Sequence, residues 1–202
     1  MRLDKIVWRT IASTLLAILI LLAMLTCLLC CAFPSTMMEM TYELGMDGAS
    51  VHFAMSAYGR SGSVEYVAFA TETAIGADMD ESVETCGLKL IADNEFDEYC
   101  DRRNEKLDTT KITYRQYVFG QVSVAQYRMD KKAEAQDTAF LGVGNTFPQN
   151  NAVVGLLITA ITQEDGATVA EIKTRMQALQ SSVTESAQAT YLAEAIALCD
   201  NV

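Results

Sequence analysis

The sequence predicts an all-α protein: one N-terminal transmembrane helix, followed by a domain that is either a stack of helical hairpins or a helical bundle. Two observations carry this prediction. The first is an apolar run over residues 11–33 that contains no charged residue, no glycine and no proline. The second is that apolar residues beyond this run recur at three- and four-residue intervals, behind residues that favour helix N-termini.

The apolar run is long enough to span a bilayer as a helix. At about 1.5 Å per residue it reaches roughly 35 Å, against a hydrocarbon core of about 30 Å. Arg2, Lys5 and Arg9 precede the run, and no further Lys or Arg follows until Arg60. Because short basic flanks stay in the cytoplasm, residues 1–10 are predicted to be a cytoplasmic tail and the remaining chain to lie outside the cell membrane. The single-pass topology suggests a bacterial plasma membrane.

Two other fates of this segment stay open. A cleaved signal peptide also has a basic start and an apolar centre, but that centre is usually about 7–15 residues long. No clear cleavage site of small residues follows the run. A bacterial lipoprotein needs a small residue just before the modified cysteine, whereas Cys27 follows Thr26 and Cys30 follows Leu29. The sequence therefore favours an uncleaved signal-anchor helix.

The composition restricts the partners of the domain. The formal net charge of the chain is −11, and the basic tail contributes charge of the opposite sign, so the part beyond the apolar run is strongly acidic. Nucleic acids and anionic lipid surfaces attract basic proteins, so neither is expected to bind this domain. The expected partners are the lipid bilayer around the N-terminal helix and another protein.

Residues 34–47 are predicted to be a juxtamembrane connector, in which a capping box of Thr36 and Glu39 opens a short helix. Residues 48–202 are predicted to form one extracytoplasmic helical domain, because a chain of this length can bury a single core. The first half of this domain has four successive apolar stripes with helical spacing, which predict helices over residues 48–59, 64–77, 79–92 and 95–107.

The second half of the domain is less regular. Residues 109–129 are rich in β-branched and aromatic side chains, which favour a strand, but their apolar spacing and their helical surroundings favour a helix. Residues 130–150 are predicted to be a loop with a helical part at its start. The apolar run 152–161 is too short to span a membrane and predicts a buried helix. Two more helices are predicted after Asp165 and Thr184.

Two cysteines of the domain, Cys86 and Cys100, flank the turn at Asp93 and Asn94 at similar distances. In an antiparallel hairpin of the helices around that turn, the two cysteines would lie level with each other on the apolar stripes. They can form a disulfide if their Cα atoms come within about 7 Å. Otherwise both are buried thiols, and the spacing leaves the two alternatives open.

Residues 58–78 resemble one tetratricopeptide repeat, a helix–turn–helix unit of about 34 residues. The match lies in the aromatic residue and glycine around the turn and in the residues that end the second helix, namely Tyr58, Gly62, Ala74, Ile75 and Asp78. Three positions depart from the pattern, namely Val67, Thr71 and Met79. A second unit, extending to Leu107, keeps the outline of the repeat.

The resemblance implies a right-handed stack of helices with a concave surface that binds a peptide or a partner protein. Tyr58, Tyr66 and Phe69 are the residues expected to contribute to such a surface. Aromatic side chains are, however, more often buried in a core than exposed at a binding site.

No catalytic, cofactor or metal site is predicted. His52 is the only histidine, and no glycine-rich phosphate loop or activated cysteine is recognisable. We therefore expect a non-enzymatic, membrane-anchored domain that binds or scaffolds another protein at the outer face of the cell membrane. The alternative is a small structural subunit whose N-terminal helix packs inside a larger membrane complex, because its small side chains permit close helix approach. An enzyme that uses cysteine or carboxylates is a third hypothesis.

Overall fold

The computed structural model describes residues 3–106, 112–143, 152–184 and 186–201. Within these ranges the protein is all-helical, which confirms the predicted fold class. The described helices are α1 (Leu3–Ala32), α2 (Pro34–Glu43), α3 (Asp47–Ser61), α4 (Val64–Gly76), α5 (Asp80–Ile91), α6 (Phe96–Asn104), α7 (Tyr114–Arg128), α8 (Lys132–Gly142), α9 (Ala152–Thr162), α10 (Gly166–Gln180), α11 (Ser186–Leu198) and a final 3-10 turn, η1 (Cys199–Asn201).

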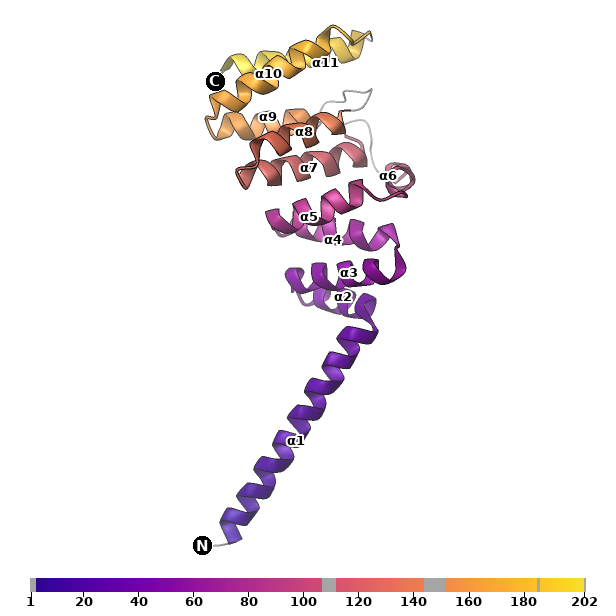
Figure 1. Ribbon diagram of the computed structural model, residues 1–202, viewed down its shortest axis with the longest axis vertical. Coiled ribbons are helices and arrows are strands. Elements are labelled where there is room, and N and C mark those ends of the chain that lie inside the picture. The colour runs from indigo at the N-terminus through magenta and orange to yellow at the C-terminus, as the bar shows by residue number, and fades with distance from the viewer. Residues whose placement is uncertain (1–2, 107–111, 144–151, 185, 202) are drawn as a thin grey trace.

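Helix α1 projects away from the rest of the molecule (Figure 1). Its apolar part, Val7–Ala32, has 26 residues; the most apolar 18-residue window within it has a mean hydropathy of 3.0, and none of that window is buried. Among the described helices it is the one long and apolar enough to cross a membrane. Helix α9 is also apolar but is short, and most of its large side chains lie in the core of the domain.

Helices α2 to α11 form an elongated stack in which most helices pack on their neighbours in the sequence (Figure 1). The order is broken at α6, because α5 packs on α7. Small and medium apolar side chains fill the interfaces between layers, including Ala54, Val67, Leu90, Val122 and Leu157, all without exposed surface. The chain ends lie at opposite ends of the molecule, and this linear order is that of a stack rather than a closed bundle.

Four turns of the stack share one geometry. A residue with positive φ follows each of α2, α4, α7 and α9, namely Gly45, Asp78, Asp130 and Glu164. At each turn the next N–H donates to the carbonyl five residues back, at 2.9–3.0 Å, as in a Schellman motif. The following helix always begins two residues after the positive-φ residue. The turns are 33, 52 and 34 residues apart, so two intervals agree and the middle one contains an extra segment.

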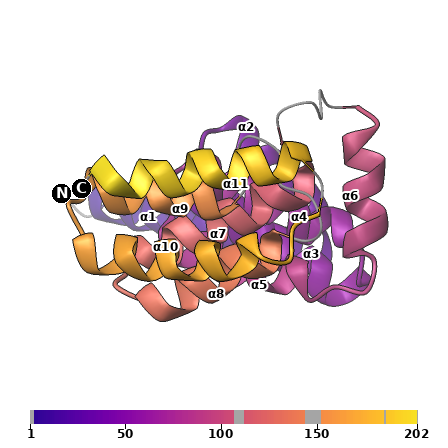
Figure 2. The ribbon, with the colours of Figure 1, turned by 90° about the horizontal axis from the view of Figure 1, so that it is seen from above.

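The extra segment contains α6, which lies crosswise to the other helices of the stack (Figures 1 and 2). The predicted antiparallel hairpin around Asp93 and Asn94 is therefore wrong, and α7 takes the place against α5. The cause lies in the width of the apolar faces. Helix α6 buries only Phe96 and Cys100, which cannot cover α5, whereas α7 buries side chains along its whole length.

The segment predicted as a connector, residues 34–47, is largely helix α2, the first layer of the stack. The helix begins at Pro34, whose fixed φ and missing N–H suit the first helical position, so the expected capping box at Thr36 does not open it. Met38 is buried, and its carbonyl accepts a hydrogen bond from Ser50 of α3 at 3.1 Å. The juxtamembrane segment is thus part of the domain core.

The ambiguous segment 109–129 is helical from Tyr114 to Arg128, as predicted, and residues 109–111 lie outside the described ranges. The predicted helical part of segment 130–150 is α8. Asp165 caps α10 as predicted, because its carboxylate accepts the N–H of Thr168 at 3.2 Å.

Candidate functional site

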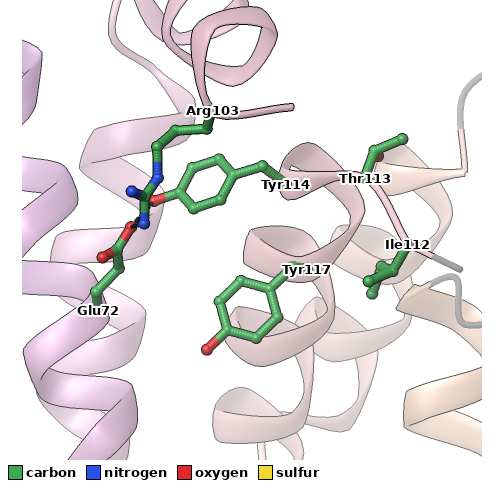
Figure 3. A pocket seen from close by; sticks show the side chains of 6 residues that line it. All are labelled: Glu72, Arg103, Ile112, Thr113, Tyr114 and Tyr117. Atoms are coloured by element: carbon green, nitrogen blue, oxygen red, sulfur yellow. Dashed lines mark hydrogen bonds and ion pairs between the residues drawn. The ribbon is translucent and has the colours of Figure 1, made fainter. Parts of the chain in front are cut away.

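A pocket of about 350 Å³ lies where α6 crosses beside α4 and the start of α7 (Figure 3). It is the result of the extra segment, because α6 stands off the stack at this level. Its walls are mainly aromatic and aliphatic, with one acidic and one basic side chain at the α4–α6 side. The lining residues are Glu72, Arg103, Ile112, Thr113, Tyr114 and Tyr117.

Glu72 of α4 is the centre of the polar wall. Its Oε1 accepts the Arg103 Nη2 donor of α6 at 2.7 Å and the hydroxyl of Tyr114 of α7 at 2.8 Å. The Arg103 guanidinium also lies over the Tyr114 ring, 5.3 Å from its centroid, which is within the range of a cation–π contact (Figure 3). One carboxylate of α4 therefore joins this helix to α6 and α7, at residues 31 and 42 positions further along the chain.

Three tyrosine rings gather around this carboxylate. The Tyr99 ring meets the Tyr114 ring edge-on at a centroid distance of 5.6 Å, and the Tyr114 and Tyr117 centroids are 6.3 Å apart. Burial, followed by the negative charge of Glu72, raises the pKa of all three phenols above the usual value for tyrosine. The phenols stay protonated at neutral pH, and that of Tyr114, which is buried, donates a hydrogen bond to Glu72.

Local sequence signals place these side chains. Thr113 and Gln116 form a capping box that starts α7 just before Tyr114, and the Tyr114 N–H donates to Asn104 Oδ1 at 2.8 Å. Glu65 and Glu72 are seven residues apart on α4, and therefore lie on one face of the helix. Each forms an ion pair with α6, Glu65 with Arg102 at 3.2 Å and Glu72 with Arg103.

A second, smaller hollow of about 160 Å³ adjoins the pocket and follows the seam between α7 and α9. It shares Ile112 and Tyr117 with the pocket, and Ile158 at its far end has 52% of its surface exposed. Its lining is mostly aliphatic, amide and glycine: Ile112, Gln116, Tyr117, Gly120, Gln121, Val124, Val154, Gly155 and Ile158. The two hollows share a wall made of Ile112 and Tyr117, and we call them together the tyrosine groove.

A third, polar hollow of about 410 Å³ lies between the turns after α7 and α9. Its centre is Asp165, which accepts hydrogen bonds from Lys132 at 2.6 Å and from the Tyr127 and Thr168 hydroxyls at 2.8 Å. These donors, Lys132 first, hold the pKa of Asp165 below its usual range. This carboxylate caps α10 through Thr168 and joins it to Tyr127 and Lys132 around the turn after α7, so we assign the cluster a structural role.

The sequence-predicted surface residues lie apart from the tyrosine groove. The Tyr58 hydroxyl donates to Asp93 at 2.7 Å, which fastens α3 to the turn after α5. Phe69 meets the Tyr42 ring edge-on at 5.3 Å. Tyr66 is half-buried against the core. These three side chains thus belong to separate packing contacts and form no common site.

The remaining sequence-predicted residues are placed as follows. Cys86 and Cys100 are buried free thiols, and α6 turns away from α5 instead of bringing the two cysteines level. Burial raises the pKa of Cys86 to about 11 and that of Cys100 to about 12. Arg9 is exposed on α1, and Arg2 lies outside the described residues. Lys5 lies in the first turn of α1.

Sequence reasoning missed the tyrosine groove. A signal was present, because Tyr114 and Tyr117 belong to the aromatic-rich segment 109–129 and Tyr99 lies shortly before it, but the aromatic richness counted only as a tendency toward strand. Comparisons of the chain with protein-family models, curated proteins and solved structures found no match. The function therefore has to be argued from the geometry of the site.

Proposed function

We propose that this protein is a non-enzymatic, membrane-anchored helical-repeat domain that binds an extended segment of a partner protein in the tyrosine groove. The observation that carries the proposal is the groove itself: two adjoining, mainly apolar hollows that share the Tyr117 side chain and lie beside helix α6. Its two adjoining hollows suit an extended chain with successive apolar side chains better than they suit a compact cofactor.

The chemistry of the groove supports recognition. Tyrosine and arginine are over-represented where proteins bind proteins, because each combines a large contact area with a polar end. Glu72 and Arg103 neutralise each other, so the pocket carries no strong field and would favour an aromatic or long aliphatic side chain over a charged one. The Tyr117 hydroxyl can donate to a backbone carbonyl of the bound segment.

The recurring turns support the repeat architecture. Intervals of 33 and 34 residues between equivalent turns are those of a tetratricopeptide-like repeat, and the turn at Gly62 between α3 and α4 lies where the resemblance places it. Repeat stacks present extended surfaces and supply binding rather than chemistry.

The state of α1 supports anchoring. Its large apolar side chains, such as Leu19 and Leu21, are 62% and 68% exposed. Leaving the apolar side chains of Val7–Ala32 in water is strongly unfavourable, at about 25 cal/mol for each Å² of apolar surface, so lipid or another protein must cover them. The basic residues before α1 favour a cytoplasmic N-terminus and an extracytoplasmic domain.

The test uses full-length protein in membranes of its own organism, with the photo-crosslinking residue p-benzoylphenylalanine in place of Tyr117. We expect it to crosslink to one short apolar or aromatic segment of a partner. The matched control carries the same residue in place of Tyr66, which is also a half-buried tyrosine but lies outside the groove. Tyr117→Ala should weaken co-purification of that partner by about tenfold or more, because truncation of a central aromatic residue typically costs 2 kcal/mol or more.

Equal crosslinking at both positions, or undiminished binding by Tyr117→Ala, would reject the groove as the binding site. The alternative function, a structural subunit held by α1, predicts a different result. In that case the partner would crosslink to α1, because small residues on α1 would provide the contact. Co-purification of the partner would then be unaffected by substitutions in the groove.

A further inference from the structure

The exposed apolar side chains of the domain are concentrated beside α1. Outside α1 the described part of the chain exposes nine large apolar side chains, and five of them lie within residues 33–46. These five are Phe33, Met40, Tyr42, Leu44 and Met46, with 46–66% of their surface exposed. The other four are scattered singly over later helices. Single exposed apolar residues need no explanation, but a cluster marks a surface that something covers.

The cluster is continuous with the apolar helix. The Phe33 N–H still donates to the Leu29 carbonyl at 2.9 Å, so the chain leaves α1 without a spacer. At Phe33 itself the backbone departs from helical geometry, with φ −132° and ψ 62°, and α2 turns away from the α1 axis as the first layer of the stack (Figure 1). Helix α2 is therefore the layer next to whatever surrounds α1.

One face of α2 carries the largest exposed side chains. Met40 and Leu44 are one helical turn apart, and Phe33 lies two turns before Met40, so the three share a face. The buried face of α2 packs on α3, as Met38 and Thr41 show. Glu39 and Glu43 are exposed on the remaining face. The helix thus has three faces, one for the core, one apolar and exposed, and one acidic.

A second contact fixes the domain against the end of α1. The guanidinium of Arg60, at the end of α3, donates to the carbonyls of Cys31 and Ala32, the last two residues of α1. These carbonyls have no partner within their own helix and carry the negative end of its dipole, so a cation there is favourable. Helix α1 is thus in contact with both α2 and α3 at its end.

From these contacts we infer that α2 is an interfacial helix, which places Phe33, Met40 and Leu44 in the headgroup–acyl boundary of the bilayer that α1 spans. The inference rests on the proposed membrane anchoring. An amphipathic helix in this position buries its apolar face about 5–10 Å into the boundary. The acidic face of α2 stays in water, and Arg60 lies at the level of the phosphates. The stack then stands on the membrane with α2 as its base and carries the tyrosine groove away from the surface.

The test reads depth from tryptophan fluorescence in vesicles of a zwitterionic phosphatidylcholine. Trp8 is the only tryptophan, so a Trp8→Phe background allows a single tryptophan to be placed elsewhere. Met40→Trp should lose most of its fluorescence to lipids brominated near the glycerol end of the chain, and less to lipids brominated near the methyl end. Leu141→Trp on α8, at a site 69% exposed, is the matched control and should be quenched by neither.

Leu19→Trp, in the middle of α1, separates the membrane anchoring by α1 from the interfacial position of α2. Strong quenching by lipids brominated near the methyl end is expected there if α1 spans the bilayer. If Leu19→Trp is quenched but Met40→Trp behaves like Leu141→Trp, the interfacial position of α2 is refuted and the anchoring stands. If Leu19→Trp is not quenched either, the anchoring itself fails. If the Met40→Trp fluorescence is not quenched by brominated lipid and shifts to shorter wavelength only at high protein concentration, a second copy of the chain covers the apolar face of α2. That result would overturn the inference.

Discussion

Alanine at position 87 tests the packing of α5 on α7, which is the least expected contact of the fold. A Cβ atom on Gly87 would lie 2.2 Å from Val122 Cγ2, whereas carbon atoms in contact are normally about 3.5–4.0 Å apart. Val122 has no exposed surface, and a valine in a helix strongly prefers one χ1 rotamer, so it cannot turn aside. The two helices would have to separate by about 1 Å or more.

The expected net effect of Gly87→Ala is a loss of roughly 1–2 kcal/mol in the free energy of unfolding. Overpacking of a filled core typically costs about 1–3 kcal/mol, and the better helix propensity of alanine returns up to about 1 kcal/mol. Gly59→Ala in α3 is the matched control, because a Cβ there meets nothing within 4 Å. It should gain about 0.5–1 kcal/mol, the ordinary difference between alanine and glycine in a helix.

The assay is urea unfolding of the full-length protein in detergent micelles, followed by circular dichroism, with amide hydrogen exchange to locate the change in α5 and α7. In the double variant with Val122→Ala the Cγ atoms are absent, so the two losses should be less than additive by about 1 kcal/mol or more. If Gly87→Ala stabilises the protein as Gly59→Ala does, α5 and α7 are not in contact. The hairpin of α5 with α6 that the sequence predicts would then be the correct topology.

Three further outcomes follow from the polar and thiol groups. Glu72→Gln removes the ion pair to α6; because both side chains are more than a third exposed, the loss of global stability should stay below about 1 kcal/mol, while amide exchange in α6 rises. The Lys132 donor lowers the pKa of Asp165, so the ionised carboxylate stabilises the folded protein. This contribution is complete above the unfolded-state pKa of about 3.9 and is lost as the pH falls through the lower folded-state pKa. Asp165→Asn should flatten that part of the acid unfolding curve, and an unchanged curve would contradict the assignment. Cys86 and Cys100, with the pKa raised by burial to about 11 and about 12, should react with a maleimide at neutral pH only after unfolding; rapid labelling of the native protein would refute their burial.

The sequence contained most of the information about single helices and little about how they meet. Apolar spacing located α3, α4 and α5 because those helices bury one face each, and periodicity reports that directly. For the segment around Tyr114, apolar spacing together with the helical surroundings favoured the helix that the structure contains, where β-branched residues alone favour a strand. The sequence pattern misplaced the start of α2. The helix begins at Pro34, in the first helical position, and not at the capping box predicted at Thr36.

The candidate site was out of reach for a different reason. Glu72 contacts Arg103, more than 30 residues away in the sequence, and Tyr114, more than 40 residues away. No local sequence rule pairs residues at these separations. Their meeting depends on α6 lying crosswise, which in turn depends on α7 competing successfully for the apolar face of α5. Short-range patterns report what each helix can bury, but not which of two candidate helices buries it.

The inserted segment connects the architecture to the proposed function. The turns at Gly45, Asp78, Asp130 and Glu164 repeat at 33 and 34 residues except where α6 intervenes, so the stack continues through the insertion without a change in its turn geometry. The pocket forms at that one irregular level, from α6 and the two helices it touches. Scaffold and site therefore depend on different contacts, and the two can be separated: Gly87→Ala disturbs the stacking of α5 on α7, whereas Glu72→Gln loosens α6 and leaves that stacking intact. If Glu72→Gln weakens partner binding while the stack stays folded, specificity lies in helix α6 and not in the stacked helices.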